Sequence, residues 1–279
     1  MFQDKLQSQR FELKYIVPEP VALAAREFVR CHLKLDDYCV DRPDFSYAIH
    51  SLYLDSDDLT LYGHTINGNK NRFKLRLRFY NDNPTAPVFA EIKRRVNNAI
   101  LKQRCAIKRD AVSSLLQGRM PPPAQMVSQD PRHLIALERF LQLTLDTRAK
   151  PKAHVAYRRE AWLSPHDNYV RVTMDRDVRF EVQQDAHLCT QMHGPASVFG
   201  SKVVLEIKFT GRFPEWMRDF VRSFGLTQCS AAKYADGVTV VGEHRFGRMP
   251  SLGQTNRRNA VRRPLKTEYA SNQAIKGAP

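Results

Sequence analysis

The feature that most constrains this chain is a strict alternation of apolar residues with lysine and arginine. From Phe73 to Phe79 every second residue is phenylalanine or leucine, and the residues between them are Lys74, Arg76 and Arg78. Alternation with a period of two predicts a β-strand with one apolar and one cationic face. Stacked cations repel one another unless a counter-charge lies nearby. A single strand of this kind is still compatible with an ordinary antiparallel sheet whose polar face meets water.

Cationic faces recur on most of the predicted strands, and several of them carry one carboxylate among the cations. These carboxylates are Glu12, Glu91 and Glu206. Because burying an unpaired cation is costly, we expect the charged faces to line a hydrated space. A sheet closed into a barrel would give such a lumen, and the lumen would receive a polyanion. Arginine and lysine would bind its phosphate oxygens, while the carboxylates could hold a bridging divalent cation.

The predicted fold class is α+β: an eight-stranded antiparallel β tunnel barrel with a charged lumen, flanked by helices. The strands are expected at Arg10–Val17, Ala48–Asp55, Arg72–Tyr80, Pro87–Arg95, Ile100–Lys108, Ala153–Leu163, Tyr169–Arg179 and Lys202–Phe209. Helical periodicity predicts helices at Val21–Leu33, Asp110–Gln117, Pro131–Leu145, Pro214–Phe224 and Ala231–Val241. Proline at the first turn and Gly225 just past the end support the boundaries of Pro214–Phe224.

The chain is expected to form one domain, residues 1–244, and a basic tail, residues 245–279. Between Arg245 and Pro279 there are eight lysines and arginines but a single acid, Glu268. Few apolar residues accompany them, so the tail cannot bury enough surface to fold alone. Such an arm would attach to a polyanion or an acidic membrane surface, or only increase solubility.

Composition narrows the class of protein. The 279 residues carry a formal charge of +15, and 42% of them are hydrophobic, which is typical of a soluble globular protein. Neither a membrane-spanning apolar run nor a secretory signal is recognisable, so we expect a cytoplasmic protein, compatible with peripheral attachment to a membrane or with a membrane partner. Five dispersed cysteines and isolated histidines predict neither disulfides nor a zinc site. No oligomeric state is assigned.

Short motifs, in order along nearly the whole predicted domain, resemble the triphosphate tunnel metalloenzymes and, among them, the VTC domain of polyphosphate polymerases. The motifs are Arg10–Tyr15, Ser51–Ser56 with Leu61-Tyr62, Lys74–Tyr80, Glu91–Lys93, Lys102-x-Arg104, Ala156–Glu160, Val170–Asp175, Glu206–Phe209 and Ser230–Tyr234. The resemblance implies the tunnel barrel described above. It also implies a metal-dependent (Mn²⁺ or Mg²⁺) transferase that moves the terminal phosphate of ATP onto inorganic polyphosphate.

The resemblance assigns roles to individual residues. The triphosphate would be bound by six cations: Arg76, Arg78, Lys93, Lys102, Arg159 and Arg171. Lys14 and Lys233 would contact the transferred or acceptor phosphate, and Tyr157 could donate to a phosphate oxygen. Lys74, Lys208 and Ser230 are further candidates for substrate binding. Glu206 is the first candidate for a metal ligand, followed by Glu12 and Glu91, whose alternative role is to orient neighbouring cations.

Two departures from the family pattern bear on this assignment. The triphosphatase branch typically opens with ExExK, but here Arg10 occupies the first position, which favours the polymerase branch. The polymerases often carry Ser-Lys-Tyr where this chain has Ala232-Lys233-Tyr234, so one hydroxyl contact is lost unless Ser230 replaces it.

Two alternative functions stay open at the level of sequence. Water could attack in place of a polyphosphate chain, which would make the protein a metal-dependent phosphatase of inorganic triphosphate or nucleotides. Alternatively, the chain could be a non-catalytic, basic polyanion-binding protein. No module for sequence-specific recognition of nucleic acid is recognisable.

Overall fold

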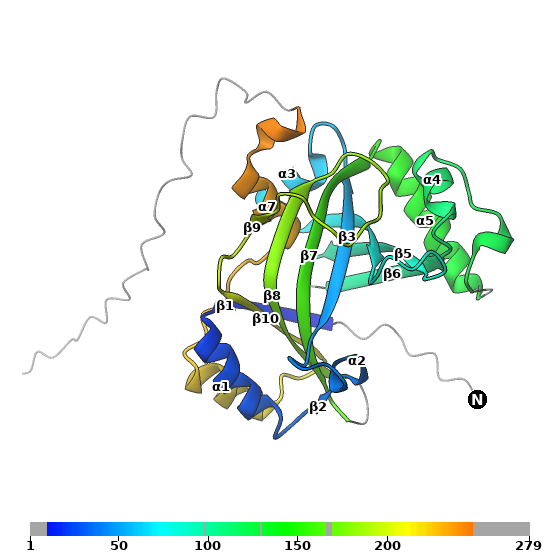
Figure 1. The fold of residues 1–279 in the computed structure, drawn as a ribbon. Coiled ribbons are helices and arrows are strands. Elements are labelled where there is room, and N and C mark those ends of the chain that lie inside the picture. The colour runs from blue at the N-terminus through cyan, green and yellow to red at the C-terminus, as the bar shows by residue number, and fades with distance from the viewer. Residues whose placement is uncertain (1–9, 98, 129, 166–168, 248–279) are drawn as a thin grey trace, which may run out of the picture. The chain divides into compact units, whose positions relative to one another are not determined.

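The computed structural model describes residues 10–97, 99–128, 130–165 and 169–247, all within one compact unit that ends at Arg248. Its core is a ten-stranded antiparallel sheet, in which long curved strands cross the centre of the molecule (Figure 1). The strands are β1 (Arg10–Val17), β2 (Lys34–Leu35), β3 (Tyr47–Asp55), β4 (Asn71–Phe79), β5 (Val88–Val96), β6 (Ala99–Ile107), β7 (Lys150–Leu163), β8 (Val170–Val182), β9 (Ala196–Ser197) and β10 (Val203–Thr210).

The main path through the sheet runs β1-β10-β8-β7-β3-β4-β5-β6, and the two-residue strands β2 and β9 pair with β7 and β8. The predicted α+β class and the antiparallel sheet are confirmed. The prediction of eight strands closed into a barrel was wrong: the described residues form ten strands, and among them the sheet is open between β1 and β6. These two end strands still approach within 8 Å between Cα atoms. Lys93 of β5, the strand next to β6, reaches across to β1, where its Nζ contacts Glu12 Oε2 at 2.7 Å.

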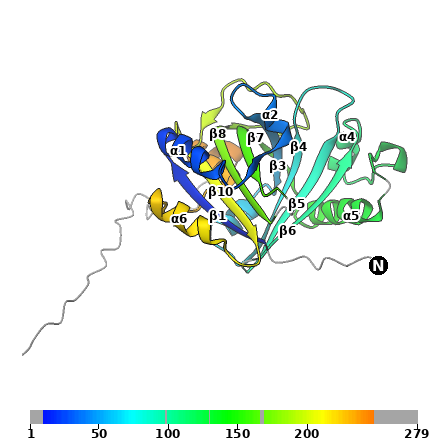
Figure 2. The same ribbon diagram turned by 90° about the horizontal axis from the view of Figure 1, so that it is seen from below.

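Helices pack on both faces of the sheet. They are α1 (Glu19–Val29), α2 (Asp37–Val40), α3 (Thr60–Ile66), α4 (Ala111–Leu116), α5 (Pro131–Asp146), α6 (Glu215–Ser223) and α7 (Lys233–Val241), with 3₁₀ turns at Pro123–Gln125 and Glu243–Phe246. Figure 2 shows α1 and α6 on one side of the strands and α4 and α5 on the other. The third group, α3 and α7, lies near one end of the long strands.

Each helix group buries its own apolar cluster against the sheet. Leu75 and Leu77 of β4 pack with Phe140 of α5. Under α1 and α6, Val172 and Leu205 form a second cluster, and α3 and α7 cover a third. Since burial of such side chains contributes about 1.5–3 kcal/mol each, the apolar faces of the first two clusters turn outward toward α1, α4, α5 and α6. In contrast, α3 and α7 pack on the inner face, against Tyr53 and Tyr157. The alternating cationic faces must then point to the inside of the curved sheet.

Two short helices were missed because neither is long enough to show a 3.6-residue period. Tertiary contacts define α3: the buried Asp55 carboxylate accepts hydrogen bonds from the backbone N–H groups of Leu61 and Tyr62 and from the Tyr234 hydroxyl, at 2.8–3.0 Å. At α2, the Asp36 carboxylate caps the helix by accepting from the Tyr38 N–H at 3.1 Å.

The end of the described chain belongs to the folded unit. Phe246 lies in the last 3₁₀ turn, is buried, and meets Phe180 edge-on at 6.3 Å between ring centroids. Residues 248–279, most of the predicted tail, lie outside the described residues, so the predicted domain boundary and the disorder of the tail stay predictions. Within the described residues, no helix is both long and apolar enough to cross a membrane.

Candidate functional site

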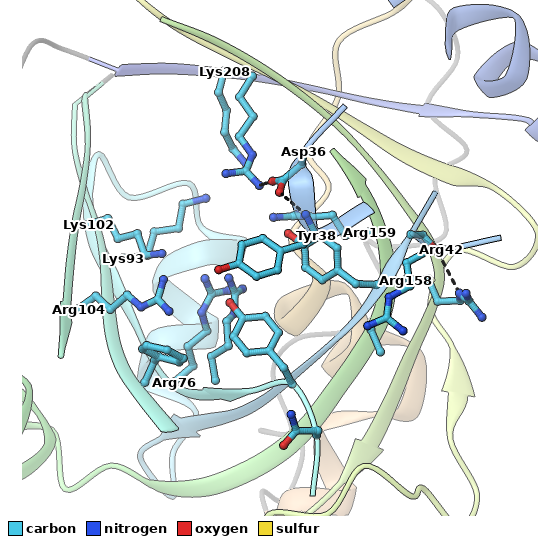
Figure 3. Close-up of a pocket in the computed structure, with 18 of the residues that line it drawn as sticks. Asp36, Tyr38, Arg42, Arg76, Lys93, Lys102, Arg104, Arg158, Arg159 and Lys208 are labelled. Atoms are coloured by element: carbon cyan, nitrogen blue, oxygen red, sulfur yellow. Dashed lines mark hydrogen bonds and ion pairs between the residues drawn. The ribbon is translucent and has the colours of Figure 1, made fainter. Parts of the chain in front are cut away.

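Two connected cavities lie on the inner face of the sheet. The inner cavity encloses about 70 Å³ and the outer one about 1050 Å³. Five cationic side chains line both cavities, so the outer cavity leads into the inner one. They belong to Arg76, Arg78, Lys93, Arg159 and Lys208. Figure 3 shows Arg76, Lys93, Arg159 and Lys208 converging from opposite walls.

Most of the predicted site residues line one cavity or both. Besides the five shared side chains, the inner cavity is lined by Lys14, Tyr53, Lys74, Tyr157, Glu206, Ala232 and Lys233. Among the predicted residues, the outer cavity adds Glu12, Lys102 and Arg171. Ser230 is exposed and lines neither cavity, and Glu91 is completely buried behind the wall.

Strand register explains this convergence. Antiparallel pairing sets Arg76 opposite Glu91, Lys14 opposite Glu206 and Arg159 opposite Asp175. Directly opposed residues on one face of a sheet have Cβ atoms about 5 Å apart, so charges of opposite sign come into contact. Each strand thus contributes cations, and its neighbour supplies part of their counter-charge.

Glu91 organises the arginine wall. Its carboxylate contacts Arg76 at 2.6 Å and Lys102 at 2.8 Å, and Arg78 and Arg104 lie at 3.7 and 3.8 Å. Burial by itself raises the pKa of this carboxyl, but the neighbouring cations, above all Arg76 and Arg78, lower it far below its ordinary value. Because Glu91 lines neither cavity, this geometry favours its alternative role, the orientation of cations, over metal binding.

Glu206 and Asp175 hold the opposite wall. Lys233 Nζ lies 2.6 Å from Asp175 Oδ2 and 3.2 Å from Glu206 Oε1, while Arg159 makes a bidentate contact with Asp175 at 2.6 and 2.7 Å. Lys208 contacts Glu206 at 2.6 Å. Burial raises the pKa of the Glu206 carboxyl, but the surrounding lysines outweigh it, so its pKa lies well below the ordinary value. Both carboxylates are therefore ionised at neutral pH.

Glu12 and Glu206 are the carboxylates that best fit a divalent cation. Lys14 Nζ lies between them, 3.6 Å from Glu12 Oε1 and 3.3 Å from Glu206 Oε1, so a positive charge already occupies the space they share. Their oxygens suit Mg²⁺ or Mn²⁺, which commonly bind through one or two carboxylates together with substrate phosphates. Within the described residues, no group of three or more His, Cys, Asp or Glu side chains is placed to hold a metal. Phosphate oxygens and water would have to complete the coordination.

Lys74 differs from the other cations of the inner cavity. Within the described part of the chain, no carboxylate lies at salt-bridge distance from its ammonium group. Burial, reinforced by the charges of Lys14 and Lys93, lowers the pKa of Lys74 to about 7. The inner cavity thus holds positive charge that its own carboxylates do not balance, which favours the entry of an anion.

Sequence reasoning missed several residues of the site. The hydroxyl of Tyr53 accepts a hydrogen bond from Arg76 Nη1 at 3.0 Å, and its position on the β3 alternation could have indicated this. Asp175 shares a face with Arg171 and could have been found in the same way. The residues at the outer mouth, including Arg42 and Tyr38, come from the connection between β2 and β3, where no periodicity exists.

Comparisons with known proteins give distant structural likenesses. A candidate adenylate cyclase from Bacillus halodurans aligns with 13% identity and a TM-score of 0.45, covering 81% of this chain and 94% of that one. The PH1819 protein from Pyrococcus horikoshii OT3 aligns with 13% identity and a TM-score of 0.42, covering 84% and 99%. A candidate adenylate cyclase from Vibrio parahaemolyticus gives 10% identity, a TM-score of 0.40, and coverage of 82% and 97%.

No curated protein matches the sequence. In contrast, the family model of the VTC domain matches residues 9–241, which include both cavities and every predicted site residue. The chain therefore belongs to the VTC domain family.

Proposed function

We propose that this protein is a polyphosphate polymerase, which transfers the terminal phosphate of ATP to a growing chain of inorganic polyphosphate. The observation that carries the proposal is the convergence of cations from many strands onto a narrow inner cavity that opens into a wider one. Together with membership of the VTC domain family, this supports an enzyme acting on phosphates. ATP and polyphosphate would be its partners, and the cytoplasm its location.

In the proposed reaction, an anionic oxygen at the end of the polyphosphate chain attacks the γ-phosphorus of ATP. A new P–O bond forms, the bond between the γ-phosphorus and the bridging oxygen breaks, and ADP leaves with that oxygen. Arg76, Arg78 and Lys93 would hold the triphosphate, and Lys14 and Lys233 would contact the transferred or acceptor phosphate. Such positioning and charge neutralisation is the main contribution of proteins to phosphoryl transfer.

A divalent cation bound by Glu206 and Glu12 would neutralise charge on the phosphate oxygens. Lys14, which contacts both carboxylates, could then turn its ammonium group toward a phosphate oxygen. Tyr157 supports the same assembly, because its hydroxyl accepts a hydrogen bond from Arg78 Nη2 at 3.2 Å and can donate its own proton to a phosphate oxygen.

The charges of the cavity favour a phosphate nucleophile over water. Attack by water requires a base to accept its proton, whereas the chain end is already an anion. The carboxylates Glu12 and Glu206 are poor bases, because neighbouring lysines lower the pKa of each despite its burial. This favours the polymerase over the triphosphatase.

Incubation of the purified protein with ATP and Mn²⁺, followed by gel electrophoresis, tests the proposal. We expect a ladder of polyphosphate chains and release of ADP. Replacement of the buried Glu206 in Glu206→Gln should lower turnover on the order of 10²-fold, as for the loss of one charge-stabilising group. The control Glu27→Gln changes an exposed carboxylate that pairs with Arg30 on the same helix side, and it should retain full turnover.

Other products would reject the polymerase. Orthophosphate without a ladder would identify a triphosphatase. Absence of turnover, combined with tight polyphosphate binding, would identify a non-catalytic polyanion-binding protein.

A further inference from the structure

The wall of the outer cavity contains a run of aromatic rings that the phosphate chemistry does not use. We call Tyr38, Tyr47, Tyr80 and Phe89 the aromatic rim. Neighbouring rings are 6.1 Å apart from Tyr38 to Tyr47, 6.3 Å from Tyr47 to Tyr80 and 5.9 Å from Tyr80 to Phe89, measured between centroids. All four line the outer cavity, and none of them lines the inner one. The site is therefore graded, with phosphate-binding groups inside and aromatic surface outside.

Among the residues of the aromatic rim, Tyr38 is the one whose position is least explained by packing against other side chains. It is 78% exposed, although an aromatic ring gains most of its stabilisation from burial. The backbone that carries the ring is held in place, because Asp36 accepts from the Tyr38 N–H with Oδ1 and contacts Arg171 with Oδ2 at 3.0 Å. Figure 3 shows Tyr38 among the cationic side chains of the cavity. An exposed ring on a braced helix is a suitable surface for stacking.

The rim lies beside the groups that would bind phosphate. Tyr47 pairs directly with Arg159 in the β3–β7 register. Phe89 carries the Arg104 guanidinium over its ring, 3.5 Å from the centroid. A ligand with a charged tail in the cation cluster would thus place its next few atoms against aromatic rings.

We propose that the aromatic rim binds the nucleobase of a nucleoside triphosphate whose phosphates point into the inner cavity. The inference rests on the proposed function, and adds to it the means by which the nucleoside is held. Stacking uses the π-face that every base has, so it discriminates weakly between bases. Purine and pyrimidine nucleoside triphosphates should therefore bind with similar affinity, and all of them more tightly than inorganic tripolyphosphate.

Titration calorimetry without divalent cations, which prevents turnover, tests the rim. The probes are ATP, which has a base, and tripolyphosphate, which lacks one. Tyr38→Ala should weaken ATP binding about tenfold, the usual effect of losing one stacking ring, and leave tripolyphosphate binding within twofold. Tyr38→Phe should restore ATP binding. Val40→Ala, which alters an exposed residue of the same helix that lines neither cavity, should change neither ligand.

Each other outcome would overturn the inference. Equal weakening of ATP and tripolyphosphate by Tyr38→Ala would mean that Tyr38 supports the cavity and not the base. Unchanged ATP binding, or differences above tenfold among ATP, GTP, CTP and UTP, would exclude sequence-tolerant stacking. If the wild-type protein bound neither ATP nor tripolyphosphate, the proposed function would be rejected, and with it the proposed role of the aromatic rim. Binding of tripolyphosphate without any gain for ATP would reject the rim alone.

Discussion

Lys74 shows how a single side chain can make phosphate binding depend on pH. The charges of Lys14 on β1, Lys93 on β5 and Arg72 on its own strand act against its ammonium form, and that of Asp236 on α7 favours it. Burial together with the like charges lowers the pKa of Lys74 to about 7, so the amine is largely neutral at pH 8 in the free protein. A bound polyanion favours the protonated form and raises that pKa.

We therefore expect tripolyphosphate binding to take up a proton above pH 7 and to weaken as the pH rises from 7 to 9. The sign follows from linkage: the bound state holds more protons than the free state, so added base opposes binding. Calorimetry in buffers of different protonation enthalpy measures the uptake. Lys74→Met should reduce the uptake by up to about one proton and make the pH dependence shallower. Lys102, whose pKa is lowered to about 7, and Lys208, whose pKa is lowered to about 8, keep part of that dependence in place. Lys70→Met, an exposed neighbour, should change neither. Equal uptake in wild type and Lys74→Met would contradict the assignment.

Among the elements, α7 most directly connects packing with the site. Its first residue, Lys233, contacts Asp175 and Glu206, and one turn later Gly237 lies against β8. A Cβ atom at Gly237 would lie 2.0 Å from Phe180 Cδ2, closer than any real contact. The missing side chain is thus what lets α7 approach the sheet closely enough for Lys233 to reach the cavity.

Gly237→Ala should destabilise the protein by about 1–3 kcal/mol, the usual effect of overpacking. Turnover should fall as well, because the displaced helix carries Lys233 away from Glu206. Urea unfolding and ATP turnover measure the two effects. The matched control is Gly63→Ala in α3, where an added Cβ meets no atom within 4 Å. There, alanine should be neutral or stabilise the protein by about 0.5–1 kcal/mol. Equal stability of the two variants would refute the packing argument.

At the scale of the whole molecule, Phe246 belongs to the apolar core of the folded unit. Because this ring is 4% exposed and packs on Phe180, a chain that stops at Arg245 leaves a void in the third apolar cluster. Losing a buried phenylalanine costs about 3–5 kcal/mol, which corresponds to a Tm lower by roughly 5–15 °C for a unit of this size.

A chain that stops at Gly247 should keep the wild-type Tm and polyphosphate synthesis, while its affinity for polyanions at low salt falls with the basic residues removed. Thermal unfolding and gel assays of both truncations check this. Loss of synthesis in the longer, stable truncation would shift the function from the cavity to the tail.

The sequence predicted the eight long strands to within about three residues at each end, and it placed the cations on one face. This succeeded because alternation is a property of consecutive residues and needs no knowledge of distant contacts. Proline marked the start of α5 and of α6, and Gly225 marked the end of α6, in the same local way. The helices α2 and α3 were missed, since each has too few turns to show a helical period. Each depends on one aspartate: Asp36 caps α2, and the buried Asp55 accepts hydrogen bonds from the backbone of α3.

Only the tertiary structure decided what the charged faces do together. Glu12, Glu91 and Glu206 look alike in sequence, yet Glu91 is enclosed behind arginines, while Glu12 and Glu206 share the ammonium group of Lys14. The open edge between β1 and β6 and the aromatic rim also depend on strand twist and on loops that meet across the sheet. The alternation within a segment determines the face of the strand on which each side chain lies. Long-range packing determines the strands and loops that surround that face, and no local pattern encodes this packing.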